Sequence, residues 1–172
     1  MTLMTLQDLL IHELRDLRSG EEQLTSALPK MAAAAQDPDL KGGFERHLLE
    51  TKRHLELVTA ALEKLGAGTD STKCAAMAGI IKEGDDLIKT QGQAAVKDAA
   101  LIGAAQRVEH YEIAGYGTAR EFAQLLGHNE VLGLVEEILG QEHATNDKLT
   151  ELAVHINREA LGDVETRART VG

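Results

Sequence analysis

The chain has 172 residues, a formal net charge of −10 and only 2% aromatic residues. This length suits one domain with a single core, and the excess of acids excludes a function that depends on coating nucleic-acid phosphates with Lys and Arg. The single cysteine, Cys74, excludes an internal disulfide, and no run of about 18 apolar residues is present to span a membrane. Because the N-terminus also lacks a basic region followed by an apolar run, we expect a cytoplasmic protein.

Apolar residues recur with helical spacing along most of the chain. Runs of β-branched residues are scarce and only two prolines occur, so the sequence predicts an all-α protein. Glycines such as Gly66 and Gly127 give the stop signals that separate the predicted helices. In chain order, these helices cover residues 5–35, 38–65, 75–89, 93–126 and 129–162.

The lengths of the connections predict how the four long helices pair. Two tight turns each join a pair of long helices, whereas residues 69–92 form a long crossover that carries the short extra helix. This is the connectivity of ferritin-like four-helix bundles, because simple up-down bundles have three short loops. We therefore expect a ferritin-like four-helix bundle over residues 1–162, followed by a flexible C-terminal tail over residues 163–172.

Acidic residues interrupt the apolar stripes of three long helices. Glu21 takes a core position of the first and Glu142 one of the last, while Glu109 and Glu112 take two consecutive stripe positions of the third. An unpaired buried carboxylate costs several kcal/mol, whereas a whole domain is stable by only about 5–15 kcal/mol. No Lys or Arg lies on these stripes at the acidic level. Divalent metal ions are the most economical partners for so many acids.

The second helix allows two adjoining stripes. One runs through Phe44 and Thr51, and the other runs through His47, Glu50 and His54. Glu50 and His54 are four residues apart, a spacing that places both side chains on one helix face. They therefore join the candidate ligands, with a histidine at the edge of the core, hydrogen-bonded to a carboxylate, as the alternative for His54.

The spacing of the acids around the two tight turns predicts that they lie at one level. Glu21 precedes Glu50 by 29 residues, and Glu112 precedes Glu142 by 30 residues. Since antiparallel helices rise equally away from their turn, the members of each pair lie at similar distances from it. All four long helices can then contribute an acid to the same section of the bundle.

Other residues near these positions have plainer expected roles. We expect His47 and His143 to face solvent or to hydrogen-bond a ligand, and His110 to point away from the apolar stripe. Tyr116 is expected in the core, with a hydrogen bond to the site or electron relay as the alternative, and it is the only candidate catalytic residue. Cys74 is expected to be buried and inert.

Four segments of the chain resemble the YciF/YciE-like ferritin-like proteins, and the resemblance extends over nearly the whole sequence. These segments are QLTSALPKM, CAAMAGIIKEG, DAALIGAAQRVEHYEIAGYGTAR and LTELA. The resemblance implies a rubrerythrin-type di-metal centre in a stress-associated bacterial protein. Carried over to this sequence, the implied metal ligands are Glu21, Glu50, His54, Glu109, Glu112 and Glu142. One departure is Asn146, which stands where the family often has Asp and would offer a neutral amide.

The types of ligand narrow the choice of metal. Five carboxylates with two divalent cations leave a net charge of about −1, and a change in oxidation state or a bridging hydroxide alters that total. Two iron ions, with manganese as the alternative, therefore suit the site better than zinc, which prefers tetrahedral sets of Cys and His.

Together these features predict a di-iron or di-manganese protein that reacts with peroxide or dioxygen in stress defence, with Glu50 and Glu142 bridging the metals. An oxidoreductase of the peroxidase, catalase or ferroxidase type would fit. A peroxidase would need an external electron donor, because the chain has no Cys-x-x-Cys pair of its own. We expect a homodimer without nucleic-acid or membrane partners. Two alternatives stay open: a non-catalytic bundle that binds or sequesters metal, and a metal-free structural stress-response protein.

Overall fold

The computed structural model describes residues 3–70 and 73–170, with side chains up to residue 162. These residues form five helices and no β-strand, so the all-α class is confirmed. The helices are α1 (Leu6–Ala34), α2 (Pro38–Lys64), α3 (Ala75–Lys89), α4 (Ala94–Leu125) and α5 (Asn129–Thr170).

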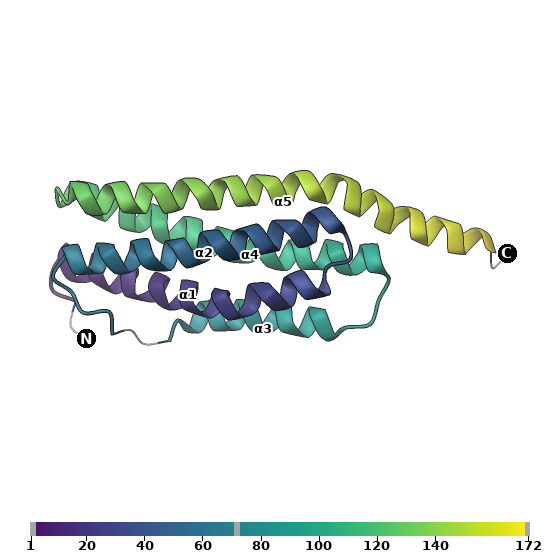
Figure 1. Cartoon of the computed structure of the whole chain (residues 1–172), viewed down its shortest axis with the longest axis horizontal. Helices are drawn as coiled ribbons and strands as arrows, with labels where there is room; N and C mark the ends of the chain where they lie inside the picture. The colour runs from purple at the N-terminus through teal and green to yellow at the C-terminus, as the bar shows by residue number, and fades with distance from the viewer. Residues whose placement is uncertain (1–2, 71–72, 171–172) are drawn as a thin grey trace.

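The four long helices form a bundle of two antiparallel hairpins, α1–α2 and α4–α5 (Figure 1). The hairpins meet through contacts of α2 with α5 and of α1 with α4. The short helix α3 lies in the crossover between them and packs on α1 and α4. This arrangement confirms the expected ferritin-like bundle with its long crossover and extra helix.

Local signals set where the helices begin and end. Thr5 and Asp8 form a capping box at the start of α1, in which each side chain accepts a hydrogen bond from the backbone N–H of the other. Asp37 caps α2 by accepting hydrogen bonds from two N–H groups of its first turn. Gly66 and Gly127 follow α2 and α4 with positive φ angles of 66° and 73°. Glycine adopts this conformation without the strain that a Cβ would bring.

The apolar core is divided into two clusters along the bundle axis. One cluster surrounds the α1–α2 turn and includes Leu28, Phe44 and Ile102. The other lies toward the α4–α5 turn and includes Leu14 and Val135. On each long helix, the buried acids and histidines lie between the residues that belong to the two clusters, except for Asp98 near the start of α4. A polar layer therefore crosses the middle of the bundle.

Helix α5 is longer than the sequence pattern predicts. It continues to Thr170, whereas its expected end was near residue 162. Figure 1 shows that its C-terminal part runs past the end of the bundle. The division into a domain over residues 1–162 and a flexible tail stays a prediction. Within the described chain, no helix combines the length and apolarity needed to cross a membrane.

Candidate metal centre

The polar layer contains six buried side chains that could ligate a cation, and all four long helices contribute to it. Each of the residues that carry them is at most 3% exposed. They are Glu21 of α1, His47 and His54 of α2, Glu109 and Glu112 of α4, and Glu142 of α5.

Their ligand atoms gather into two groups that share Glu142. The first group, Glu21, His54 and Glu142, is called the closed half below; the second, which adds His47, Glu109 and Glu112 to Glu142, is called the open half. Within each group the ligand atoms lie within 4.8 Å of one another. Two adjacent groups with one common carboxylate form the arrangement in which a Glu can bridge two metal ions.

Short distances link histidine to carboxylate in both halves. In the closed half, His54 Nδ1 lies 2.8 Å from Glu142 Oε1 and 3.6 Å from Glu21 Oε1. In the open half, His47 Nε2 lies 3.2 Å from Glu109 Oε1.

Most of these buried atoms nevertheless lack a hydrogen-bond partner among the described residues. Both carboxylate oxygens of Glu112 and of Glu142 are in this state, as are both ring nitrogens of His47 and Nδ1 of His54. Buried polar atoms in native proteins are almost always hydrogen-bonded, so a whole layer of exceptions requires an explanation. Oxygen and imidazole ligands that converge on a point are suited to divalent cations. The residues present therefore fit a metal centre.

Burial and neighbouring charges shift the pKa values of the side chains in the polar layer. Burial and the neighbouring Glu142 together raise the pKa of Glu21 to about 8, against the opposing effect of His54. Burial likewise raises the pKa of Glu109 to about 7 and that of Glu112 well above its ordinary value. Without a cation, the layer therefore retains protons on carboxyl groups that are ionised in water.

The pKa values of the two histidines rise and that of Glu142 falls, so that all three side chains favour their charged forms. Burial lowers the pKa of His54, but its contact with Glu142 outweighs this and leaves the pKa at about 8. The pKa of His47 is raised well above its ordinary value in spite of burial, because Glu109 lies beside it. The pKa of Glu142 is lowered in spite of burial, since both histidines favour its carboxylate.

Two further side chains orient ligands of the closed half. The Tyr116 hydroxyl donates a hydrogen bond to Glu21 Oε1 at 2.6 Å, and Tyr116 is fully buried. His54 Nε2 lies 2.8 Å from Gln141 Oε1, which leaves Nδ1 to face the carboxylates. Such partners fix the orientation of a ligating histidine or acid. The expected core position of Tyr116 is confirmed, and its catalytic role stays a prediction.

The structure brings together five of the six ligands predicted from the sequence. Glu50 lies outside both groups: its side chain is 44% exposed, and its Oε2 lies 3.5 Å from His47 Nδ1. Its predicted role as a bridging ligand is therefore not reproduced in this arrangement, where Glu142 is the residue common to both groups. Metal binding by any of these residues stays a prediction.

Of the two roles expected for His47, facing solvent is wrong, whereas a contact with a ligand agrees with the 3.2 Å between its Nε2 and Glu109 Oε1. His47 is 3% exposed and belongs to the open half. The buried face of α2 combines His47 and His54 of one predicted stripe with Thr51 of the other. The signal that could have found His47 is its spacing of seven residues from His54, which is two helical turns.

Other expectations about the surroundings of the site hold. His110 and His143 are exposed. Asn146 is partly buried, and its amide oxygen has no hydrogen-bond partner within the described chain. Cys74 is buried as expected, and its thiol donates a hydrogen bond to Asp16 at 3.0 Å.

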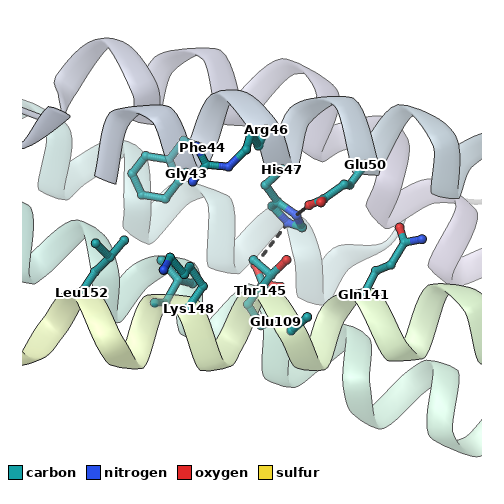
Figure 2. A pocket seen from close by; sticks show the side chains of 12 residues that line it. Gly43, Phe44, Arg46, His47, Glu50, Glu109, Gln141, Thr145, Lys148 and Leu152 are labelled. Atoms are coloured by element: carbon teal, nitrogen blue, oxygen red, sulfur yellow. Dashed lines mark ion pairs between the residues drawn. The ribbon is translucent and has the colours of Figure 1, made fainter. Parts of the chain in front are cut away.

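A cavity of about 290 Å³ opens between α2 and α5 onto the open half. Figure 2 shows His47 and Glu109 pointing toward each other beside it, with Phe44 and Leu152 toward one end and Glu50 and Gln141 toward the other. The residues of the closed half that are not shared, Glu21 and His54, do not line this cavity. The two halves of the centre thus differ in access.

A family model described as "Domain of unknown function (DUF892)" matches residues 5–161. The chain belongs to this family. It is 42% identical over 162 residues to Protein YciF of Escherichia coli strain K12, which covers 93% of this chain and 98% of that protein. Its fold is similar to the crystal structure of the E. coli stress protein YciF, with a TM-score of 0.88 and 41% identity over 91% of this chain and 99% of that one.

Two other solved structures have similar folds. YcfI from Rhodopseudomonas palustris, whose name proposes a structural role, matches with a TM-score of 0.82 and 41% identity, covering 86% of this chain and 94% of that one. A Bacillus anthracis structure described as ferritin-like, diiron-carboxylate matches with a TM-score of 0.67 and covers 88% of this chain and 99% of that one. At 18% identity, this last likeness establishes the fold alone.

Proposed function

We propose that this DUF892-family protein is a di-metal carboxylate protein that reacts with peroxide or dioxygen in stress defence, with two iron ions as its cofactors and manganese as the alternative. The observation that carries the proposal is the pair of buried ligand groups joined at Glu142, since most of their ligand atoms lack a hydrogen-bond partner elsewhere in the described chain. The stress-protein description of the relative YciF and the diiron-carboxylate description of the B. anthracis neighbour agree with it.

The ligand geometry suggests how the residues would share two cations. Glu21 and His54 would bind one ion, and His47, Glu109 and Glu112 the other, with Glu142 between them. When bound, a pair of redox-active ions supplies two electrons to an oxidant. The protein would hold the ligands in place through Tyr116 and Gln141 and keep bulk water from the closed half.

The acids of the layer would exchange protons for metal. In the protein without metal, burial keeps the pKa of Glu21, Glu109 and Glu112 above the ordinary value of a carboxyl group. Ligation requires the ionised carboxylate, so metal uptake should release protons and strengthen as the pH rises.

A peroxidase cycle would draw electrons from outside this chain, whose sequence has no Cys-x-x-Cys pair. A catalase cycle would not, because peroxide itself serves as both oxidant and reductant. The external donor and a homodimeric assembly remain predictions.

A non-catalytic protein that holds metal is the second candidate. Full burial of Glu21 and His54 favours it, because exchange of an ion at that depth should be slow. The name of the R. palustris relative favours a third reading, a structural protein without metal.

Elemental analysis of the full chain, produced separately in iron- and manganese-supplemented medium, tests the proposal first. We expect about two redox-active ions per chain. Peroxide consumption is then measured with and without added reductant: consumption in either case supports the oxidoreductase, and metal without consumption supports the holding protein. Protein without bound metal, which also takes none up from ferrous or manganous solution, would contradict the proposal.

A further inference from the structure

The cavity between α2 and α5 is much larger than a peroxide or dioxygen molecule requires. Its volume of about 290 Å³ compares with roughly 30 Å³ for one water in the liquid. A cavity of this size approaches the range found for small organic ligands, about 300–1,000 Å³. Because His47 and Glu109 line it, a molecule bound there would contact the candidate metal centre directly.

The walls of the cavity have the character of a site for an apolar chain. Phe44, Leu149 and Leu152 line it, and Figure 2 places Phe44 and Leu152 facing each other across its end. Gly43, with no side chain, widens the space beside Leu152. Burying each CH₂ of a ligand against such walls is favourable by about 0.8 kcal/mol.

Two cations lie along the same cavity. Arg46 makes no hydrogen bond or ion pair within the described chain, and Lys148 pairs only with the exposed Glu151, at 3.0 Å. Two carboxylates also line the cavity and would repel an anion, but both lie beside His47, and the charge of Arg46 further lowers the pKa of Glu50. In a chain with a net charge of −10, two cations beside an apolar pocket favour an anionic head group.

We propose that this cavity binds a medium-chain aliphatic carboxylate, with its chain between Phe44 and Leu152 and its head group at Arg46 and Lys148, next to His47. This inference rests on the proposed function in one respect: the carboxylate would be the organic molecule bound at the open half, where the oxidant is proposed to react. The site itself consists of residues that are in place without metal.

Glycine substitutions offer a matched pair of variants. A Cβ at Gly43 would lie 4.0 Å from Leu152 Cδ1, so a Cβ fits there, and a longer side chain is expected to extend toward Leu152 and the cavity. Gly43→Leu should therefore fill the site without touching the candidate ligands. Gly133→Leu is the control, because Gly133 lies on the exposed side of α5 with no atom within 4 Å of its Cβ position. Both variants gain the same helix propensity.

Calorimetric titration of the metal-free full chain with decanoate tests the proposal. We expect saturable binding at one site, about tenfold weaker or more in Gly43→Leu and unchanged in Gly133→Leu. Arg46→Gln should weaken it by about two- to fivefold. Absence of saturable binding, or equal binding by wild type and Gly43→Leu, would overturn the proposal.

Histidine ring signals in NMR spectra of the same metal-free protein test where the ligand lies. Decanoate should shift the signals of His47 and leave those of His128, which is paired with Gln7 near the far end of the bundle, unchanged. A shift at neither residue, or at both equally, would reject the site. Because no metal is needed, these results are independent of the metal analysis that tests the proposed function.

Discussion

The two halves of the centre contain the same kinds of ligand but differ in their surroundings. Glu21 and His54 of the closed half are 0% exposed and are fixed by Tyr116 and Gln141. His47 and Glu109 of the open half line a cavity. If the centre binds metal as proposed, chemistry with an outside molecule is expected at the open half, whereas the closed half is expected to retain its ion. The following predictions test that difference.

Glu142→Gln should have the largest effect, because Glu142 belongs to both halves. An amide keeps the shape of the side chain but removes the charge, so we expect the content of both metal ions to fall severely. Elemental analysis measures the loss, and far-UV circular dichroism checks the fold. Glu136→Gln, on the exposed side of the same helix, is the matched control. Full metal content in Glu142→Gln would remove this residue from the ligand set.

Replacing one histidine at a time should separate the halves. His54→Gln should reduce binding in the closed half and His47→Gln in the open half, so that each variant retains about one ion per chain. Peroxide consumption should be lost most fully in His47→Gln, since the cavity leads to that half. Equal loss of both ions in each variant would mean that the halves do not bind independently.

The stability of the metal-free protein should fall as the pH rises from about 5 to about 8. The pKa values of Glu21, Glu109 and His54 are raised to about 8, 7 and 8, so the folded chain holds more protons than the unfolded chain in this window. Each group contributes an effect on the order of 1 kcal/mol per pH unit. Thermal unfolding measures it. Metal-loaded protein should show a weaker or reversed trend, because ionised ligands bind metal better. Metal-free protein that gains stability across this window would contradict the prediction.

Gly115→Ala should loosen the wall of the closed half. A Cβ at Gly115 would lie 2.6 Å from Leu17 Cδ2, so α1 and α4 would have to move apart or Leu17 repack. Overpacking of this kind costs about 1–3 kcal/mol, which urea unfolding can measure. Gly117→Ala, on the same helix with no atom within 4 Å, should be neutral or slightly stabilising. Equal stabilities would show that Leu17 adjusts freely.

Tyr116→Phe should have the smallest effect. The change removes the hydrogen bond to Glu21, a net loss of about 1 kcal/mol. That bond lowers the pKa of Glu21, so its loss should raise this pKa further and shift metal uptake by the closed half to higher pH. Metal titrations at several pH values would detect the shift. A shift in the pH dependence of metal uptake by the open half alone would argue against the assignment of Tyr116 to the closed half.

The sequence predicted the parts of the centre whose helices present one clear apolar stripe. Glu21, Glu112 and Glu142 interrupt such stripes, and an acid there has to lie in the core if the helix packs at all. The connectivity followed from the turn signals and the long crossover. For these features, local pattern and tertiary packing lead to the same answer.

Helix α2 shows where that reasoning fails. Glu50 and His47 lie roughly 60° apart around the helix, so a small rotation of α2 decides which of them is buried. That rotation depends on packing against α1 and α5, which no pattern within α2 contains. The cavity was unpredictable for the same reason, since it depends on which side chains of α2 and α5 face each other.

Because the apolar core is split in two, the bundle is held together less firmly at the polar layer than at its ends. Each apolar cluster can hold its own end of the four helices together, while the section between them is joined only by groups that cations or protons must satisfy. Backbone amide hydrogens near Glu112 should therefore exchange with solvent faster than those of either end when cations are withheld. Loading the centre would then couple the two ends into one cooperative unit.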